Sequence, residues 1–155
     1  MSTLSDSLRH LEAILRSKGV RAALIFLNGL TQHRFTALYR FDEETLRNLY
    51  FFDRDNPSQL STPDIPVMAS YCVFVRDRRA PFATSDSLKD DRVKSHSKRQ
   101  ILRSYCGVPL RDVNGEMFGT ICHFDFRPIP IADENVELME AVGPLLKKAL
   151  PGALS

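Results

Sequence analysis

Apolar positions at the start of the chain repeat at helical spacing and predict two consecutive helices. Leucines recur every three or four residues from Leu4 to Leu15, and Gly19 follows where a helix is expected to end. A second pattern of the same period runs from Val20 to Leu30. Such helices can both cover a sheet, or one can pack on the body while the other pairs with another subunit. The pattern leaves both arrangements open.

The next segments alternate between apolar and polar positions and predict a hairpin. Residues 35–41 are rich in aromatic and β-branched side chains, which is typical of a strand. The acidic residues at 42–44 form a turn, and residues 45–52 supply the partner strand. Residues 53–63 are polar, contain two prolines, and are interpreted as a loop.

A helix followed by a short strand is expected in the middle of the chain. Asp64 is placed to cap a helix over residues 67–75, and Pro66 is tolerated in its first turn because no N–H is needed there. The apolar side chains of this segment share one helical face. Residues 81–85 have the composition of a short strand.

Two further strands are predicted in the C-terminal half. Residues 104–110 are apolar and follow the most basic stretch of the chain, residues 89–103. Asn114-Gly115 is typical of a tight hairpin turn, and the apolar segment after it carries Cys122 and His123.

A last helix follows the second strand of this hairpin. Asp133 can cap it, and apolar positions recur at helical spacing as far as Leu146. Pro144 falls inside the pattern, which predicts a kink or a break near residues 140–143. The order of elements is not an alternating βαβ series. It predicts an α+β fold, in which an antiparallel sheet has helices on one face and a loop-and-helix cap on the other.

Composition agrees with one soluble domain. The 155 residues can bury a sufficient core, and 43% are hydrophobic while 26% are charged. No apolar run reaches the length of a membrane span, and the start of the chain lacks the basic residues and apolar run of a secretory signal. These features predict a cytoplasmic protein that has no membrane partner. The net charge of +2 and the absence of an evident helix-turn-helix argue against direct nucleic-acid binding.

Candidate chemistry is sparse. The three cysteines form no CxxC pair and lie in apolar segments, which predicts buried free thiols. The four histidines are far apart and predict no metal site. There is no nucleophile elbow, P-loop or GxGxxG motif, and the sequence leaves any cofactor unknown.

Four segments together resemble the GAF family, which in turn resembles PAS domains in plan. They are RFTALYRFD, DIPVMASYCVFVRD, PFATSD and SYCGVPLRDVNGEMFGTICHFDFRP, and the turn between GVPL and FGT is the most characteristic. The resemblance implies a single domain over residues 1–155, whose N-terminal helix at 1–18 can belong to a dimer interface. It also implies a small-molecule pocket between the sheet and the cap.

Mapping that pocket onto this sequence gives a set of candidate ligand-binding residues. They are Cys72, Phe74, Thr84, Tyr105, Cys106, Cys122 and Phe124, with Arg92, Lys94 and His96 at the mouth. Because strand residues alternate between faces, some of them must face the helices instead. The resemblance implies a non-enzymatic sensor, a homodimer that binds a small molecule and passes its state through the terminal helices to a signalling partner. It does not identify the ligand.

Three other functions are compatible with the resemblance. One GAF lineage reduces free methionine sulfoxide, which requires a reactive thiolate and a second, resolving cysteine. The three cysteines satisfy the count, but their apolar positions argue against this redox function. A pure interaction module, with its pocket filled by its own aromatic side chains, is another alternative. Cyclic-nucleotide binding is not one of the three, because only a fragment of its motif, NKxnFx3DE, is present.

Tetrapyrrole binding is the third alternative. Cys122-His123 and the DIP segment that begins at Asp64 are similar to motifs of phytochrome GAF domains, where the histidine faces a bilin. No cysteine lies near His96, where many of those relatives attach the chromophore. The competing interpretation is that Asp64 caps a helix and that His123 meets solvent or a neighbouring carboxylate.

Overall fold

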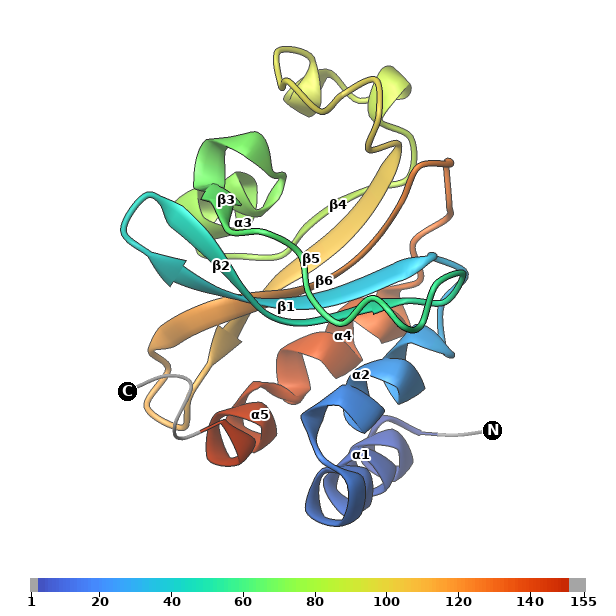
Figure 1. Ribbon diagram of the computed structural model, residues 1–155, viewed down its shortest axis with the longest axis vertical. Helices are drawn as coiled ribbons and strands as arrows, with labels where there is room; N and C mark the ends of the chain where they lie inside the picture. The colour runs from blue at the N-terminus through green and yellow to red at the C-terminus, as the bar shows by residue number, and fades with distance from the viewer. Residues whose placement is uncertain (1–2, 151–155) are drawn as a thin grey trace.

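A six-stranded sheet forms the middle layer of the computed structural model, which describes residues 3–150 (Figure 1). The strand order is β3-β2-β1-β6-β5-β4, and all neighbouring strands are antiparallel. The strands are β1 (Phe35–Asp42), β2 (Thr45–Asp53), β3 (Ile65–Pro66), β4 (Phe82–Thr84), β5 (Ser104–Arg111) and β6 (Met117–Asp125). The α+β class and both predicted hairpins are confirmed. Residues 1–2 and 151–155 of the predicted single domain lie outside the described part.

Four helices cover one face of the sheet (Figure 1). They are α1 (Leu4–Lys18), α2 (Val20–Asn28), α4 (Asp133–Ala141) and α5 (Gly143–Ala149). Gly19 separates the first two, as the sequence predicted. Within residues 3–150, none of the helices combines the length and the apolar character that a membrane span requires.

The predicted break in the last helix is confirmed, although its predicted cap is wrong. The first part ends at Ala141, and Pro144 stands in the first turn of α5. Ala132 occupies the N-cap position of α4 and no side chain caps it. Asp133 is instead the first helical residue, where its negative charge lies near the positive end of the helix dipole.

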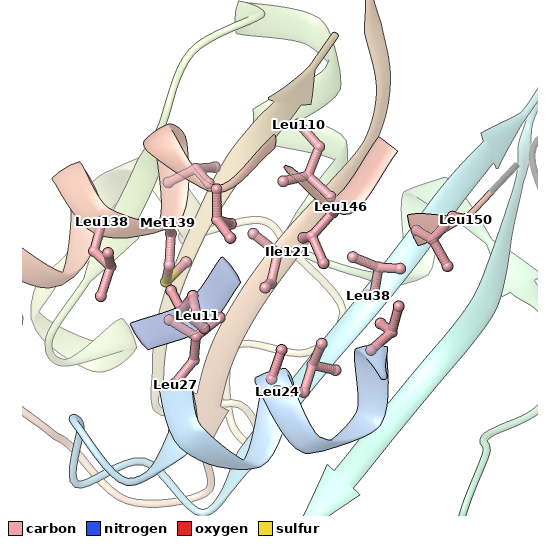
Figure 2. Close-up of a cluster of buried hydrophobic side chains, with 14 of the residues drawn as sticks. Leu11, Leu24, Leu27, Leu38, Leu110, Ile121, Leu138, Met139, Leu146 and Leu150 are labelled. Carbon is pink, nitrogen blue, oxygen red and sulfur yellow. The ribbon is translucent and has the colours of Figure 1, made fainter. Parts of the chain in front are cut away.

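Apolar side chains between the sheet and these helices form the larger core (Figure 2). Leu38 on β1, Leu110 on β5 and Ile121 on β6 are fully buried against the helices. The helices contribute Leu11, Leu24, Leu27, Leu138, Met139, Leu146 and Leu150. Burial of this apolar face explains why both terminal helical segments pack on the sheet.

The opposite face of the sheet carries a cap of short elements (Figure 1). They are the 3-10 helices η1 (Val67–Ala69), η2 (Ser87–Lys89) and η3 (Asp91–Val93), and the helix α3 (Cys72–Arg78). A second buried cluster lies beneath them and includes Tyr71, Phe82 and Tyr105. The predicted layers, with helices on one face and a cap on the other, are therefore confirmed.

The start of the cap differs from the predicted helix at 67–75. Asp64 does not cap a helix, because its carboxylate accepts a hydrogen bond from the backbone N–H of Asn48 at 3.3 Å and pairs with Arg47 at 3.1 Å. These contacts hold the chain beside β2, where Ile65 and Pro66 form β3. The 3-10 helix η1 follows β3, Ser70 after it is extended, and the α-helix begins only at Cys72.

Candidate functional site

A pocket of about 320 Å³ lies between the sheet and the cap, and we call it the cap pocket. The sheet contributes Tyr39, Tyr105, Cys122 and Phe124, with Phe126 just beyond β6. The cap contributes Ala69 and Ser70, and the loop that leads into β5 contributes Lys98, Ile101 and Leu102, while Ile65 comes from the short strand β3. The size and the mostly apolar lining are those of a small-molecule site.

Strand alternation selects which residues reach the cap pocket. Tyr105 on β5 pairs with Phe124 on β6, and both side chains point toward the cap. Cys122, two residues before Phe124, lies on the same face. Cys106 lies on the other face, in the core beneath the helices. Three of the predicted binding residues therefore line the pocket, and Cys106 is one of those that the alternation turns toward the helices.

Gly107 determines how Tyr105 lies in the floor of the pocket. The ring of Tyr105 extends over Gly107, where a β-carbon would stand only 2.5 Å from the ring carbon Cζ. In this position the Tyr105 hydroxyl donates a hydrogen bond to the Cys72 Sγ at 3.2 Å. The glycine after YC in the sequence therefore makes room for an aromatic floor, which the sequence alone did not reveal.

Cys72 and Cys122 form a pair of interacting thiols beside this floor. Both are free and buried, as predicted for all three cysteines. Burial raises the pKa of Cys122 well above its usual value. Burial acts in the same direction on Cys72, but hydrogen bonds from Cys122, Ser70 and Tyr105 outweigh it and lower the pKa of Cys72. Cys72 is fully buried and is not among the residues that line the cap pocket.

Cys106 is chemically separate from the other two thiols. It is surrounded by apolar side chains of the helix-side core, and burial raises its pKa to about 12. A thiol with so high a pKa is almost entirely protonated near neutral pH, so it is a poor nucleophile.

His96 supports the wall of the cap pocket from behind. Its Nδ1 accepts a hydrogen bond from the Lys98 backbone N–H at 3.0 Å, so Nε2 carries the proton and donates to the Ser70 carbonyl at 3.1 Å. The imidazole also packs edge-on against the Tyr71 ring, with centroids 4.7 Å apart. Burial lowers the pKa of His96. His96 therefore joins two segments of the cap without lining the pocket.

The remaining predicted residues lie away from the cap pocket. Phe74 stacks on Phe82 inside the cap, with centroids 4.6 Å apart. Thr84 and Arg92 line a wide hollow of about 740 Å³ at the β4 edge of the sheet. Lys94 is exposed on the surface. The structure thus brings Phe74, Thr84, Arg92 and Lys94 close to neighbouring elements of the cap, but not to the cap pocket.

The hollow at the β4 edge is larger than the cap pocket, but its one arginine, Arg92, is engaged within the protein. Arg92 forms an ion pair with Asp90 at 2.7 Å and donates a hydrogen bond to the Ala83 carbonyl at 2.6 Å. Its guanidinium also lies 4.5 Å from the Phe82 ring centroid. The cap pocket has a mostly apolar lining between the sheet and the cap, so it is the better candidate for a small-molecule site.

Several residues of the cap pocket were not predicted from the sequence. Lys98 was part of the basic stretch, but nothing in the pattern distinguished it from Lys94. Phe126 could have been found by extending the alternation from Cys122 and Phe124 past the end of the strand. Tyr39 could be assigned to the pocket only once the pairing of β1 with β6 was known, and the sequence pattern does not predict that pairing.

A buried polar cluster lies on the opposite face of the sheet, beneath α2, and we call it the histidine cluster. His123 Nδ1 is 2.7 Å from the Thr36 hydroxyl, which also accepts a hydrogen bond from the Asn28 amide at 2.8 Å. The rings of His33 and His123 are stacked, with centroids 6.0 Å apart. Burial lowers the pKa of His33 to about 4 and that of His123 to about 3.

The position of His123 corrects both expectations for this residue. It meets neither solvent nor a carboxylate, because it is buried and bonded to Thr36. It also does not face the cap pocket, since it alternates with Cys122 on β6. Cys122-His123 therefore resembles the phytochrome motif in sequence, but its histidine does not face the pocket as the phytochrome histidine faces its bilin. Among residues 3–150, no group of three or more potential ligands is arranged to hold a metal ion.

Comparisons with known proteins agree with this architecture. The family model described as "GAF domain" matches residues 8–150. No curated protein sequence matches the chain. The GAF domain of an Acinetobacter phosphoenolpyruvate-protein phosphotransferase superposes with a TM-score of 0.77 at 15% identity, covering 99% of this chain and 96% of that one.

Two other solved structures have the same fold at low identity. A free methionine-R-sulfoxide reductase from Neisseria meningitidis, in complex with its substrate, has a TM-score of 0.72 at 14% identity, covering 96% of this chain and 88% of that one. The chromophore-binding domain of a Stigmatella aurantiaca bacteriophytochrome has a TM-score of 0.69 at 13% identity, covering 96% of this chain and 60% of that one. At these identities the likeness shows the fold alone.

Proposed function

Because the chain belongs to the GAF domain family, we propose that it is a non-enzymatic sensor that binds a small molecule in the cap pocket. GAF domains are generally ligand-binding sensory domains. The proposal depends on one observation: a mostly apolar pocket of about 320 Å³ separates the sheet from the cap. A pocket of this size and lining suits reversible binding, in which apolar burial supplies the affinity.

The cap is the element that a ligand would bias. Its loop supplies Lys98, Ile101 and Leu102 to the pocket, whereas Tyr105 and Cys122 belong to the sheet. A molecule that contacts both the cap and the sheet stabilises the closed arrangement of the cap. It shifts the equilibrium between closed and open protein only as far as its affinities for the two states differ.

The terminal helices are the proposed output of the sensor. They cover the face of the sheet opposite the cap, and Leu4, Ile25 and Leu30 are exposed apolar side chains on or next to α1 and α2. These side chains suit a helical interface in a homodimer or with a signalling partner. We place this activity in the cytoplasm. Sedimentation velocity of the wild type and of Ile25→Glu tests the dimer, which the variant is expected to weaken.

Blocking the pocket tests the proposed function. Ala69 lines the pocket from the cap, so Ala69→Trp fills the cavity from its rim without replacing a residue of the main core. Ala13→Trp on the exposed side of α1 is the matched control. Native mass spectrometry of protein purified from its own host, together with a fragment screen followed by amide NMR, should detect small molecules that bind the wild type and Ala13→Trp but not Ala69→Trp. The proposal fails if no molecule perturbs the amides of Tyr105, Cys122 and Phe124.

The contact between Cys72 and Cys122 favours a second candidate function, thiol redox chemistry. Two thiols can reduce a sulfoxide to a thioether, which yields one disulfide and one water. A structural neighbour is a free methionine-R-sulfoxide reductase. An assay with free methionine-R-sulfoxide and dithiothreitol decides between the two functions. Turnover that is lost in Cys72→Ser would establish the enzyme, whereas the sensor predicts no turnover.

A further inference from the structure

Most polar groups in the wall of the cap pocket already have partners inside the protein. The Tyr105 hydroxyl donates to Cys72, and the Tyr39 hydroxyl is bonded to Thr62. The Ser70 hydroxyl accepts from the Cys72 backbone N–H at 3.1 Å. A ligand therefore meets few free donors or acceptors on the walls formed by these residues.

The same holds for the backbone at the loop side of the pocket. The Leu102 carbonyl accepts a hydrogen bond from the Tyr71 hydroxyl at 3.0 Å, and the Ser70 carbonyl accepts from His96. The Leu102 N–H donates to the Lys98 carbonyl at 2.8 Å. These backbone groups are engaged within the protein, and the one charged side chain is the strongest polar feature of the lining.

That side chain is Lys98, the only charged residue among those that line the cap pocket. The lysine is half-buried, and its ammonium forms no ion pair within the part of the chain that the structure describes. The lining contains no carboxylate that could receive a positively charged ligand group. The pocket is therefore complementary to one negative charge and to none of the opposite sign.

The neighbouring hollow offers no second anion site. It measures about 420 Å³ and shares Tyr39, Ile65, Phe124 and Phe126 with the cap pocket. Its one cation is Arg34, which forms ion pairs with Asp53 at 2.8 Å and with Asp55 at 3.4 Å. A ligand with two negative charges would leave one of them without a counter-charge beside apolar walls, which is costly.

The apolar part of the site is formed largely by rings. Tyr39, Tyr105, Phe124 and Phe126 supply aromatic side chains to it, and Ile101 adds an exposed aliphatic edge. At about 30 Å³ for each water-sized group, the cavity holds roughly ten such groups. Aromatic rings prefer stacked or edge-to-face contact with other rings, so a ring-containing ligand fits this lining.

From these observations we infer that the ligand class of the cap pocket is a ring-containing, otherwise apolar monocarboxylate whose carboxylate pairs with the Lys98 ammonium. The inference depends on the proposed small-molecule-binding function and specifies its ligand. It also separates the sensor from the redox candidate, because free methionine sulfoxide carries an ammonium group for which the pocket lining has no acidic partner.

Three probes that share one ring system test the inference on the intact chain. They are naphthylacetate, the uncharged naphthylethanol and the cationic naphthylethylamine, each titrated by calorimetry and by amide NMR. The wild type is expected to bind the acid at least about tenfold more tightly than the alcohol, and the amine more weakly than either, because charge-assisted hydrogen bonds are about twice as strong as neutral ones.

Variants at two lysines assign the charge effect to one side chain. Lys98→Met should weaken the acid roughly five- to tenfold and leave the alcohol within about twofold, and Lys98→Arg should retain most of the affinity for the acid. Lys94→Met is the matched control, because Lys94 is an exposed lysine that does not line the pocket. It should change none of the affinities.

The outcomes distinguish the inference from the function on which it depends. If the acid and the alcohol bind equally in the pocket, or if Lys98→Met leaves the acid unaffected, the ligand class is wrong and the sensor function stands. If probes bind but perturb no amide at Tyr105, Cys122 or Phe124, the site itself is wrong. If none of the three probes binds up to its solubility limit, the ligand class is refuted, and the fragment screen with Ala69→Trp decides on the function.

Discussion

The histidine cluster is expected to make the stability of the protein strongly dependent on pH below neutrality. Burial is the main cause of the low pKa values of His33, about 4, and His123, about 3. Asp125 acts against the shift at His33, whereas Arg54 repels a proton at both rings. Above the ordinary value of 6.5 both imidazoles are neutral in the folded and the unfolded chain, so they add no pH dependence there.

The magnitude follows from the difference between the folded and unfolded pKa values. Below pH 6.5 the unfolded chain takes up protons at His33 and His123 that the folded protein excludes, so the free energy of unfolding falls as the pH falls. At pH 5 each histidine contributes a loss of about 2 kcal/mol, since each pH unit below 6.5 is worth about 1.4 kcal/mol. The loss from both is about 4 kcal/mol, a large part of the 5–15 kcal/mol typical of a domain. It continues to grow until the pH reaches the folded pKa values.

Urea unfolding between about pH 7.5 and pH 4.5 measures this effect. Near pH 5 the slope should approach 2.7 kcal/mol per pH unit, the value for two protons. His123→Asn places an amide where the imidazole Nδ1 contacts Thr36. Because one titrating group is removed, the slope should fall by nearly half, to the value for one proton. His10→Asn, at an exposed position, is the control and should leave the slope close to that of the wild type. An unchanged slope in His123→Asn would refute the reasoning.

Three further predictions concern other parts of the structure. Gly107→Ala should destabilise the protein by about 1–3 kcal/mol in urea unfolding, because the new β-carbon overlaps the Tyr105 ring. Most of this loss should disappear when the same substitution is made in the Tyr105→Leu variant. Arg34→Met should lower the free energy of unfolding by about 3 kcal/mol, because it removes the guanidinium partner of Asp53, whose side chain is only 3% exposed. An unchanged urea midpoint would contradict this. Cys106 should resist iodoacetamide at pH 8 in the folded protein, since it is buried and its pKa is about 12, and rapid labelling seen by mass spectrometry would count against its placement.

The sequence predicted the elements whose signals are local. Asn114-Gly115 marks the turn of the β5–β6 hairpin, where Gly115 has φ +81° and the Asn114 N–H donates to the Asp112 carboxylate. Pro144 predicted the break between α4 and α5, because proline cannot continue a helix across that position without losing a hydrogen bond. Such signals depend on a few neighbouring residues, so they are visible without a structure.

The rest of the fold and most of the site depend on contacts between distant residues. Asp64 was predicted to cap a helix, yet its carboxylate is held by Arg47 and Asn48 on β2, and the chain runs beside that strand as β3 before the cap begins. Lys98 and Lys94 occur in the same basic stretch, and only the path of the loop directs one toward the cap pocket and exposes the other. Periodicity assigns residues to faces, but it does not place loop residues in space.

The alternation along β6 has a practical consequence for detecting a bound molecule. Cys122 and His123 are adjacent in the chain, yet one lies in the cap pocket and the other beneath α2. We expect a shift of the strand backbone at Cys122 to change the separation between the His123 Nδ1 and the Thr36 hydroxyl, which is 2.7 Å in this structure. If a bound molecule moves this strand, the imidazole nitrogen resonances of His123 would report pocket occupancy on the far side of the sheet without any added label.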